Sequence, residues 1–230
     1  MPSPDPAKLA AARHAVARIS DGMKIGMGTG STASIAIKVL ADRIQSEAIQ
    51  IVGAPTSFAS ERLARSLGIP TSPVSALGRL DLSFDGADEV SPELDLIKGR
   101  GAAHTREKIV ACSSEEFIVL VDDSKLVEKL GEKSPVPVEV LPMAVEFVMA
   151  ELRSLNGDPE LRMGQSKDGP VVTDQGMWIL DTRFDSIVDP ARLDQSIKSI
   201  PGVLDHGLFV GMATTVLVGT ADGTVKVLTK

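Results

Sequence analysis

The hydrophobic positions near the start of the chain follow two spacings, one typical of helices and one typical of short strands. From Leu9 to Ile19 they recur at helical spacing, and a short apolar run at residues 25–27 then ends in a glycine-rich stretch. Helical spacing resumes from Ser31 to Ile44, where either Ser31 or Thr32 is placed to cap the helix. This first part of the chain therefore predicts helix, strand, loop and helix.

Strand-like and helix-like segments continue to alternate as far as residue 131. The predicted strands are Ile49–Val52, Leu80–Phe84, Leu94–Ile97 and Phe117–Val121, and the predicted helices are Phe58–Leu67 and Thr105–Ala111. Lys125–Leu130 is predicted to be a helical turn closed by Gly131. Strands that alternate with helices form parallel βαβ units. The pattern therefore predicts an α/β, Rossmann-like main domain.

A different order begins at Val136, namely strand, helix, strand, strand, helix, strand. The segments are Val136–Val140, Met143–Leu155, Leu161–Met163, Trp178–Leu180, Ala191–Ile200 and Val203–Phe209. This order is the split βαβ arrangement of ferredoxin-like domains. A hairpin of Thr215–Val218 and Thr224–Leu228 follows, and we expect it to return to the first domain. The predicted domains are an α/β catalytic domain of residues 1–131 plus 207–230 and a smaller ferredoxin-like α+β domain of residues 132–206.

Composition narrows the class of protein. Of 230 residues, 43% are hydrophobic and 24% are charged, with a formal net charge of -7 and no apolar run long enough to cross a membrane. Lys and Arg are not clustered, which argues against nucleic-acid binding. The polar, proline-rich residues 1–6 do not resemble a signal peptide. We therefore expect a cytoplasmic protein with no membrane or nucleic-acid partner.

The cysteine and histidines predict neither a disulfide nor a metal site. Cys112 is the single cysteine, which fits a reducing compartment, and its apolar neighbours predict a core residue and not a nucleophile. The three histidines, His14, His104 and His206, lack the spacing of metal ligands. We expect neither a metal nor an organic cofactor.

A glycine-rich loop with hydroxyl side chains, from Gly26 to Thr32, joins the first strand to the next helix. Its backbone N–H groups and hydroxyls would face an anion at the N-terminus of that helix, although a tight turn would need the same glycines. No Lys precedes Ser31 and Thr32 as in a nucleotide P-loop, and Ser31 stands where a dinucleotide fingerprint has glycine. The loop therefore predicts a phosphate site that does not belong to ATP or NAD.

Charged side chains follow the next strands. Asp85-Gly86-Ala87-Asp88-Glu89 begins where a strand ends, and its carboxylates suit proton transfer, sugar hydroxyls or a plain turn. Lys98 precedes the flexible loop of Gly99, Arg100 and Gly101, and it could stabilise an oxyanion. Glu107 lies in the first turn of a predicted helix, where an acid is favourable simply through the helix dipole.

Together these motifs resemble the type A ribose-5-phosphate isomerase family. The resemblance rests on Gly28–Thr32, Asp85–Glu89, Lys98, Arg106–Lys108, Asp123–Lys125, Pro135–Val140, Gly202–Leu204 and Gly207–Phe209. Because order and spacing agree along nearly the whole chain, the resemblance is specific. It implies interconversion of ribose 5-phosphate and ribulose 5-phosphate through an enediolate in the pentose phosphate pathway, without a cofactor, by a homodimer or a dimer of dimers.

The resemblance also implies roles for individual residues. Glu107 would move a proton between C1 and C2, and Lys98 would stabilise the enediolate oxygen. Asp85 and Asp88 would bind hydroxyls and assist ring opening. The further substrate-binding residues would be Lys8, Thr29, Gly30, Ser31, Thr32, Gly86, Ala87, Gly99, Arg100, Gly101 and Lys125.

This sequence departs from the family at three places. Position 100 is Arg where the family has glycine, and position 104 is His where an aliphatic residue is usual. The turn Thr173–Gly176 replaces an Asp-Asn-Gly turn, and we expect it to lie far from the chemistry.

Two alternative functions remain. A sugar-phosphate sensor module would need an attached DNA-binding segment, but the first strand begins near Lys24 with one helix before it, which leaves no room for a helix-turn-helix. A coenzyme A transferase would use a nucleophilic Glu, and an acyl-enzyme adduct would reveal it.

Overall fold

The computed structural model describes residues 5–230, and these residues form two compact units. The first unit contains the residues up to Ala87, Arg106–Lys125 and Met212–Lys230, and the second contains Asp88–Thr105 and Leu126–Gly211. The expected domain boundaries at 131/132 and 206/207 stay a prediction. The expectation of no signal peptide concerns residues of which 1–4 lie outside the described range.

A six-stranded sheet forms the centre of the first unit within the described residues, in the order β13-β12-β6-β3-β1-β2. Its strands are β1 (Lys24–Met27), β2 (Val52–Pro55), β3 (Leu80–Gly86), β6 (Ser114–Asp122), β12 (Thr215–Gly219) and β13 (Val225–Thr229). All neighbouring pairs are parallel except β12 with β13. The predicted α/β class is confirmed, and so is the return of the C-terminal hairpin to this sheet.

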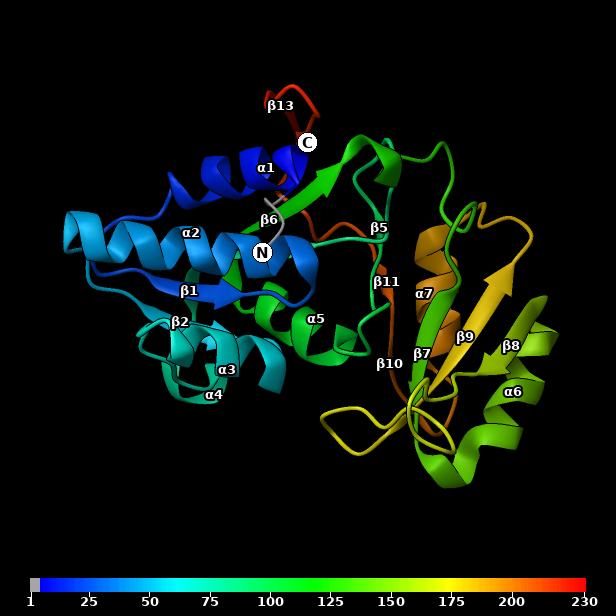
Figure 1. The fold of residues 1–230 in the computed structure, drawn as a ribbon. Coiled ribbons are helices and arrows are strands. Elements are labelled where there is room, and N and C mark those ends of the chain that lie inside the picture. Colours follow the sequence, from blue (N-terminus) through cyan, green and yellow to red (C-terminus); the bar gives the residue numbers. More distant parts are fainter. Residues whose placement is uncertain (1–4) are drawn as a thin grey trace. The chain divides into compact units, whose positions relative to one another are not determined.

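Helices cover both faces of this sheet. They are α1 (Pro6–Val16), α2 (Ser31–Glu47), α3 (Phe58–Ser66), α4 (Val74–Leu77) and α5 (His104–Cys112). The helices α1 and α2 lie side by side on one face, where Ile25 and Phe84 belong to the core, and α5 lies on the opposite face (Figure 1). On the α5 face a Cβ at Gly26 would lie 2.5 Å from both Ser83 and Val110, so only glycine allows this close packing.

The second unit contains the predicted ferredoxin-like order. The elements are β7 (Val136–Val140), α6 (Val145–Ser154), β8 (Gly157–Leu161), β9 (Trp178–Phe184), α7 (Pro190–Lys198) and β10 (Val203–His206). The strands form an antiparallel sheet in the order β10-β7-β9-β8. One face, with Val136, Val138 and Val140, packs against Val148 of α6 and Ile197 of α7.

A small antiparallel sheet completes this unit. It consists of β4 (Glu89–Val90), β5 (Leu96–Ile97) and β11 (Leu208–Phe209), in the order β11-β5-β4. The predicted single strand Val203–Phe209 is therefore wrong, because Gly207 divides it between two sheets. His206 pairs with Val138 in one sheet, and Leu208 pairs with Ile97 in the other.

Other local expectations also need correction. Residues 125–130 do not form the predicted helical turn, which lies earlier, as a short 3-10 helix at Asp123–Lys125 (η1). The chain after it bends, and the backbone N–H of Gly131 donates to the carboxylate of Glu89. Neither Ser31 nor Thr32 caps α2, because the N-cap is Gly30 with a φ of 106°. The predicted strands at 49–52 and 161–163 lie at 52–55 and 157–161.

Cys112 is exposed at the end of α5, so the prediction that it is a core residue is wrong. Val110 and Ala111 are buried, whereas Ile109 is 49% exposed. Residues three apart lie on the same side of a helix, so Cys112 shares the outward face of Ile109.

Candidate active site

The carboxyl end of the first unit's sheet has the topology that places ligands in open α/β folds. Strand β1 lies between β2 and β3 in the sheet. The chain goes from β1 to β2 on one side of β1 and later returns to form β3 on its other side, so the strand order reverses at β1. Ligands bind outside the carboxyl ends of strands at such a switch point. The loop after β1 contains Thr29, and β3 ends at Asp85 and Gly86.

The side chain of Asp85 lies directly against the loop after β1. Its Oδ1 accepts hydrogen bonds from the backbone N–H of Thr29 at 3.0 Å and of Gly86 at 2.8 Å. A Cβ at Gly28 would lie 2.2 Å from the same oxygen, which requires glycine there. The loop and the carboxylate are therefore fixed to each other, and Asp85 is only 3% exposed.

The hydroxyl of Thr29 points toward the loop after β2. Its Oγ1 lies 2.7 Å from both Thr56 Oγ1 and Ser57 Oγ. Ser57 in turn caps α3 through a capping box with Ser60. Thr29 therefore connects three adjacent strand ends, and its predicted contact with substrate stays a prediction.

The start of α2 offers donors to an anion. Ser31 and Thr32 are its first two residues, and no side chain caps the helix, so the N–H groups of its first turn have no side-chain partner at the cap. The Nζ of Lys8 lies 3.3 Å from Ser31 Oγ and adds a positive charge. Free N–H groups, two hydroxyls and a cation at a helix N-terminus can bind a phosphate group.

Glu107 lies on the α5 face of the same sheet. Helix α5 ends at Cys112 and β6 begins at Ser114, so the first turn of α5 lies toward the carboxyl edge of the sheet. Side chains alternate along a strand, so Asp85 and Ser83 both point to the α5 face. Glu107 is 6% exposed, and it shares this face and this edge with Asp85.

Arg106, the neighbour of Glu107 on α5, contacts Phe58, a residue that the sequence did not single out for the site. The guanidinium of Arg106 lies 5.1 Å from the ring centroid of Phe58, the first residue of α3. Phe58 is 59% exposed. Lys125 ends the 3-10 helix after β6, which neighbours β3, and this places it at the same carboxyl edge.

Lys98 occupies a buried position in the second unit. It follows β5 and is 3% exposed, with its Nζ 5.4 Å from the centroid of the Phe209 ring. Its backbone N–H donates to Gly207 O at 2.8 Å. The buried ammonium group is therefore held against an aromatic ring, an arrangement that stabilises a cation.

The loop of Gly99, Arg100 and Gly101 is fixed by groups around it. Gly99 has a φ of +106°, and a Cβ there would lie 2.7 Å from His104 Nδ1. The backbone N–H of Arg100 donates to Asp88 Oδ2 at 3.0 Å. The predicted substrate residues Asp88 and Arg100 are thus brought together in this unit.

An ion pair that sequence reasoning missed supports the same loop. Arg162 Nη1 donates to the carbonyl oxygens of Gly99 and Arg100, both at 3.1 Å, and its Nε donates to Asp181 Oδ2 at 2.7 Å. Arg162 follows β8 and Asp181 lies on β9, and no local pattern identifies such a pair. Only the β8–β9 pairing brings it together.

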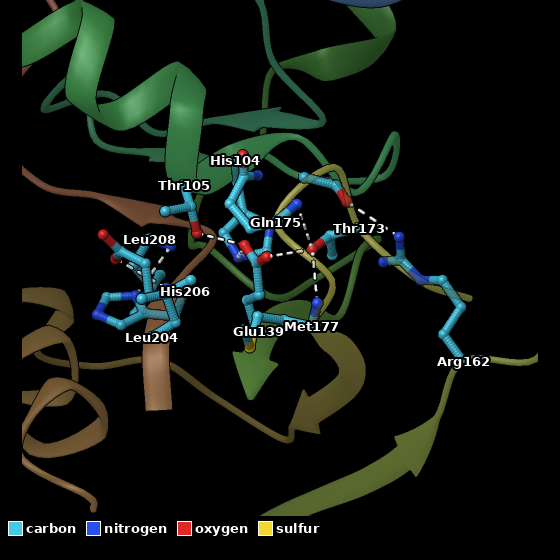
Figure 2. A network of polar contacts seen from close by, with 12 residues as sticks. His104, Thr105, Glu139, Arg162, Thr173, Gln175, Met177, Leu204, His206 and Leu208 are labelled. Carbon is cyan, nitrogen blue, oxygen red and sulfur yellow. Dashed lines mark hydrogen bonds and ion pairs between the residues drawn. The ribbon is translucent and has the colours of Figure 1, made fainter. Parts of the chain in front are cut away.

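Glu139 on β7 is the centre of a buried polar network that the sequence also did not reveal. It is fully buried, and its carboxylate accepts hydrogen bonds from the hydroxyls of Thr105 and Thr173, the second at 2.5 Å (Figure 2). His104 Nε2 lies 3.9 Å from Glu139 Oε2. Burial raises the pKa of Glu139, and the two threonine hydroxyls oppose this shift.

The Glu139 network connects the turn at Thr173 to the start of α5. The Oγ1 of Thr173 also accepts from the backbone N–H of Gln175 and Met177, at 3.2 and 3.1 Å, and thereby closes the turn. Thr105 lies two residues before Glu107 in α5. Two hydrogen bonds through Glu139 therefore join this turn to Thr105, and the expectation that the turn lies far from the chemistry stays a prediction.

The described residues contain neither a cluster of metal ligands nor a helix suited to a membrane. Within residues 5–230, no group of three or more His, Cys, Asp or Glu side chains is arranged to hold a metal ion. In the same range, no helix is both long enough and apolar enough to span a bilayer.

The fold and the polar residues at the strand ends define an α/β protein with a candidate site for a small anionic ligand at the carboxyl edge of a parallel sheet. The model of the family "Ribose 5-phosphate isomerase A (phosphoriboisomerase A)" matches residues 52–223. A protein named ribose-5-phosphate isomerase A from Thermosynechococcus vestitus is 55% identical over 92% of this chain and 90% of its own length. The chain therefore belongs to the ribose 5-phosphate isomerase A family.

Solved structures agree with this assignment. The ribose 5-phosphate isomerase A of Methanocaldococcus jannaschii superposes with a TM-score of 0.94 at 47% identity, over 99% of this chain and all (100%) of that one. A D-ribose-5-phosphate isomerase in complex with phospho-erythronic acid gives a TM-score of 0.95 at 44% identity, with 99% and 100% coverage. The resemblance read from the motifs is confirmed.

Proposed function

We propose that this protein is an aldose-ketose isomerase that interconverts D-ribose 5-phosphate and D-ribulose 5-phosphate. The observation that carries the proposal is Glu107, a carboxylate buried at the carboxyl edge of the sheet on the face to which Asp85 points. Membership of the family supports the substrate, and so does a similar structure that holds phospho-erythronic acid, which is itself a phosphorylated sugar acid.

In the proposed mechanism Glu107 removes a proton from C2 of the open-chain aldose and returns it to C1. One carboxylate can serve both carbons, because they are adjacent in the enediolate. A positioned base typically accelerates such a step by about 10²- to 10⁴-fold.

The negative charge that develops on the enediolate oxygen requires a cation or N–H donors. We propose Lys98 for this role, since its ammonium group is already buried and does not need to be desolvated during the reaction. Preorganised donors of this kind contribute about 3 to 4 kcal/mol. The proposed hydroxyl-binding residues are Asp85 and Asp88.

The phosphate group is proposed to bind at the start of α2, with Lys8, Ser31 and Thr32 as side-chain contacts. This group is remote from C1 and C2, so its binding fixes the register of the sugar without taking part in proton transfer. Lys125, at the end of β6, is the further proposed cation.

The test is the Glu107→Gln variant, which keeps the size and hydrogen bonding of the side chain. We expect it to fold and bind ribose 5-phosphate while kcat falls by at least about 10²-fold. Solvent deuterium should no longer exchange into C2 of the substrate. The assay follows ribulose 5-phosphate with and without EDTA, and we expect chelation to have no effect.

Glu146→Gln is the matched control, because Glu146 is the first-turn acid of α6 in the second unit. If Glu107 acted only on the helix dipole, both variants would lose about 0.3 to 1 kcal/mol of stability and keep their turnover. Near-normal exchange in Glu107→Gln would overturn the proposed mechanism and make Asp85 or Asp88 the next candidate for the base.

The cellular setting belongs to the same proposal. We propose a cytoplasmic enzyme of the pentose phosphate pathway that works as a homodimer or a dimer of dimers. The alternative of a sensor module without turnover has no support from the relatives, which are named as isomerases.

A further inference from the structure

The second unit contains a cleft of about 490 Å³, and most of the residues that line it are charged or polar. It is lined by Asp88, Arg100, Lys133, Ser134, Pro135, Pro137, Arg162, Gln165 and Asp181. Sites for small ligands typically measure about 300 to 1,000 Å³. The cleft is therefore large enough for a small metabolite, and it does not include the residues at the start of α2.

The charges around this cleft favour an anion. Its lining contains three cationic side chains and two carboxylates. The carboxylate of Asp181 is already engaged by Arg162, and that of Asp88 accepts the backbone N–H of Arg100. The lining therefore carries one net positive charge.

Arg100 supplies the cation with most freedom to bind a ligand. Within residues 5–230 its guanidinium has no hydrogen-bond or ion-pair partner, while its backbone N–H and C=O are both bound, the first to Asp88 and the second to Arg162. The backbone is thus fixed and the side chain is available. A guanidinium presents five N–H donors in a planar fork that fits a phosphate group.

A second segment of the lining, Lys133 and Ser134, is also held in place. The fully buried Glu89 accepts hydrogen bonds from the backbone N–H groups of Lys133, at 2.6 Å, and Ser134. The Nζ of Lys133 donates to Leu126 O at 2.9 Å. An ammonium group has three donors, so a lysine that already has a partner can contact a ligand as well.

We propose that this cleft binds the phosphate group of a small ligand, with Arg100 and Lys133 as its charged contacts and Ser134 as a hydroxyl donor. The three terminal oxygens of a phosphate match a guanidinium, an ammonium group and a hydroxyl. Because the walls are fixed by Arg162 and Glu89, binding requires little ordering of the backbone. This site is separate from the phosphate site proposed at the start of α2.

The test is isothermal titration of inorganic phosphate into the full chain at constant ionic strength. A Lys8→Ala background weakens the site at α2, so that the cleft contributes a larger share of the remaining heat. We expect phosphate binding to persist in this background, and its Kd to rise at least about tenfold when either Arg100→Ala or Lys133→Ala is added. Arg153→Ala, an exposed arginine of α6 that does not line the cleft, is the matched control.

Loss of phosphate binding in Lys8→Ala alone would overturn the proposal, and so would equal affinity in the Arg100, Lys133 and Arg153 variants. Because Arg100 and Lys133 belong to different segments of the lining, a folding defect in one variant, detected by circular dichroism, leaves the other as the test. Turnover is not the readout. A chain that binds phosphate in the cleft but does not isomerise would therefore refute the proposed function and leave this site intact.

Discussion

At the scale of single residues, Glu139 is the buried acid whose protonation bears most on stability. It is surrounded by the hydroxyls of Thr105 and Thr173 and by His104. Burial is the main cause of its raised pKa, and the charges of Asp205 and Asp174 add to the shift. A carboxyl group with a raised pKa holds its proton more tightly in the folded state than in the unfolded state.

The stability that Glu139 contributes to the folded state therefore falls as the pH rises. The stability that Glu139 contributes is fully present below its unfolded pKa of 4.5 and is lost as the pH rises through its higher folded pKa. Glutamine does not titrate, so the free energy of unfolding of Glu139→Gln relative to wild type should increase from pH 4.5 upward. The gain is about 1.4 kcal/mol for each unit by which the pKa is raised.

Glutamine also fits the hydrogen bonds at this position. The Oγ1 of Thr173 already accepts two backbone N–H groups and must donate to residue 139, so the amide oxygen should face Thr173 and the amide nitrogen Thr105. Urea unfolding at intervals from about pH 4 to 8 measures the effect. Glu160→Gln removes an exposed carboxylate from the same sheet as a control, and a difference that shrinks with rising pH would contradict the prediction.

At the scale of elements, Gly207 separates β10 from β11. Its backbone is bonded on both sides, by its N–H to Pro137 O at 2.7 Å and by its C=O to the N–H of Lys98 at 2.8 Å. A Cβ at this position would lie 2.1 Å from Lys98 O and 2.6 Å from Pro137 Cδ. The close approach of three strands to one residue therefore requires the absence of a side chain.

We expect Gly207→Ala to lower the free energy of unfolding by about 1 to 3 kcal/mol, because overpacking forces these backbones apart. The loss should be visible as a lower urea midpoint. Gly86→Ala is the stability control, since the nearest atom to its Cβ would be Leu120 O at 3.8 Å. Equal stability of the two variants would show that the chain can relax around Gly207 without cost.

The two strands that sequence reasoning displaced share a feature. The strands β2 and β8 lie at sheet edges, and each contains a proline, Pro55 in β2 and Pro159 in β8. Proline in a sequence argues against a strand. An edge strand tolerates proline because its outward N–H needs no partner. The central strand β7, with every residue buried, was predicted with its correct bounds although it contains Pro137, whereas the central strands β3, β6 and β9 are longer than predicted.

The site was predictable only as far as local motifs reach. The residues around Asp85 and Glu107 are recognisable from short segments that follow strands or begin helices. Arg162, Asp181 and Glu139 were missed, because each contacts a residue at least 19 positions away. Such contacts depend on strand pairing, which the period of hydrophobic residues does not specify.

At the scale of the whole molecule, one exposed apolar surface bears on assembly. Met143 is 94% exposed and Phe147, one helical turn later, is 50% exposed. Large apolar side chains grouped on a surface mark sites of association. Together with the homo-oligomers implied by the family resemblance, they favour contact between copies of this chain through the start of α6.

We expect the protein to have a mass in solution of at least twice its chain mass of 24.2 kDa. The double variant Met143→Asp, Phe147→Asp should shift the protein toward smaller species, because two charges cannot be buried without partners. Light scattering coupled to size-exclusion chromatography measures both. Val188→Asp is the control, since Val188 is 82% exposed but lies in a loop before α7. A wild-type monomer would contradict this prediction.

The pairing of β6 with β12 has a consequence for synthesis of the chain. Ile118 pairs with Thr215, so the first unit's sheet gains its last two strands only after the whole second unit has been translated. At about 5 to 20 residues per second, one edge of β6 stays unpaired on the ribosome for roughly 5 to 20 seconds. During this interval the nascent chain exposes an open edge of β6, which contains Ile118, Val119, Leu120 and Val121, and an unpaired edge of this kind can pair with another chain.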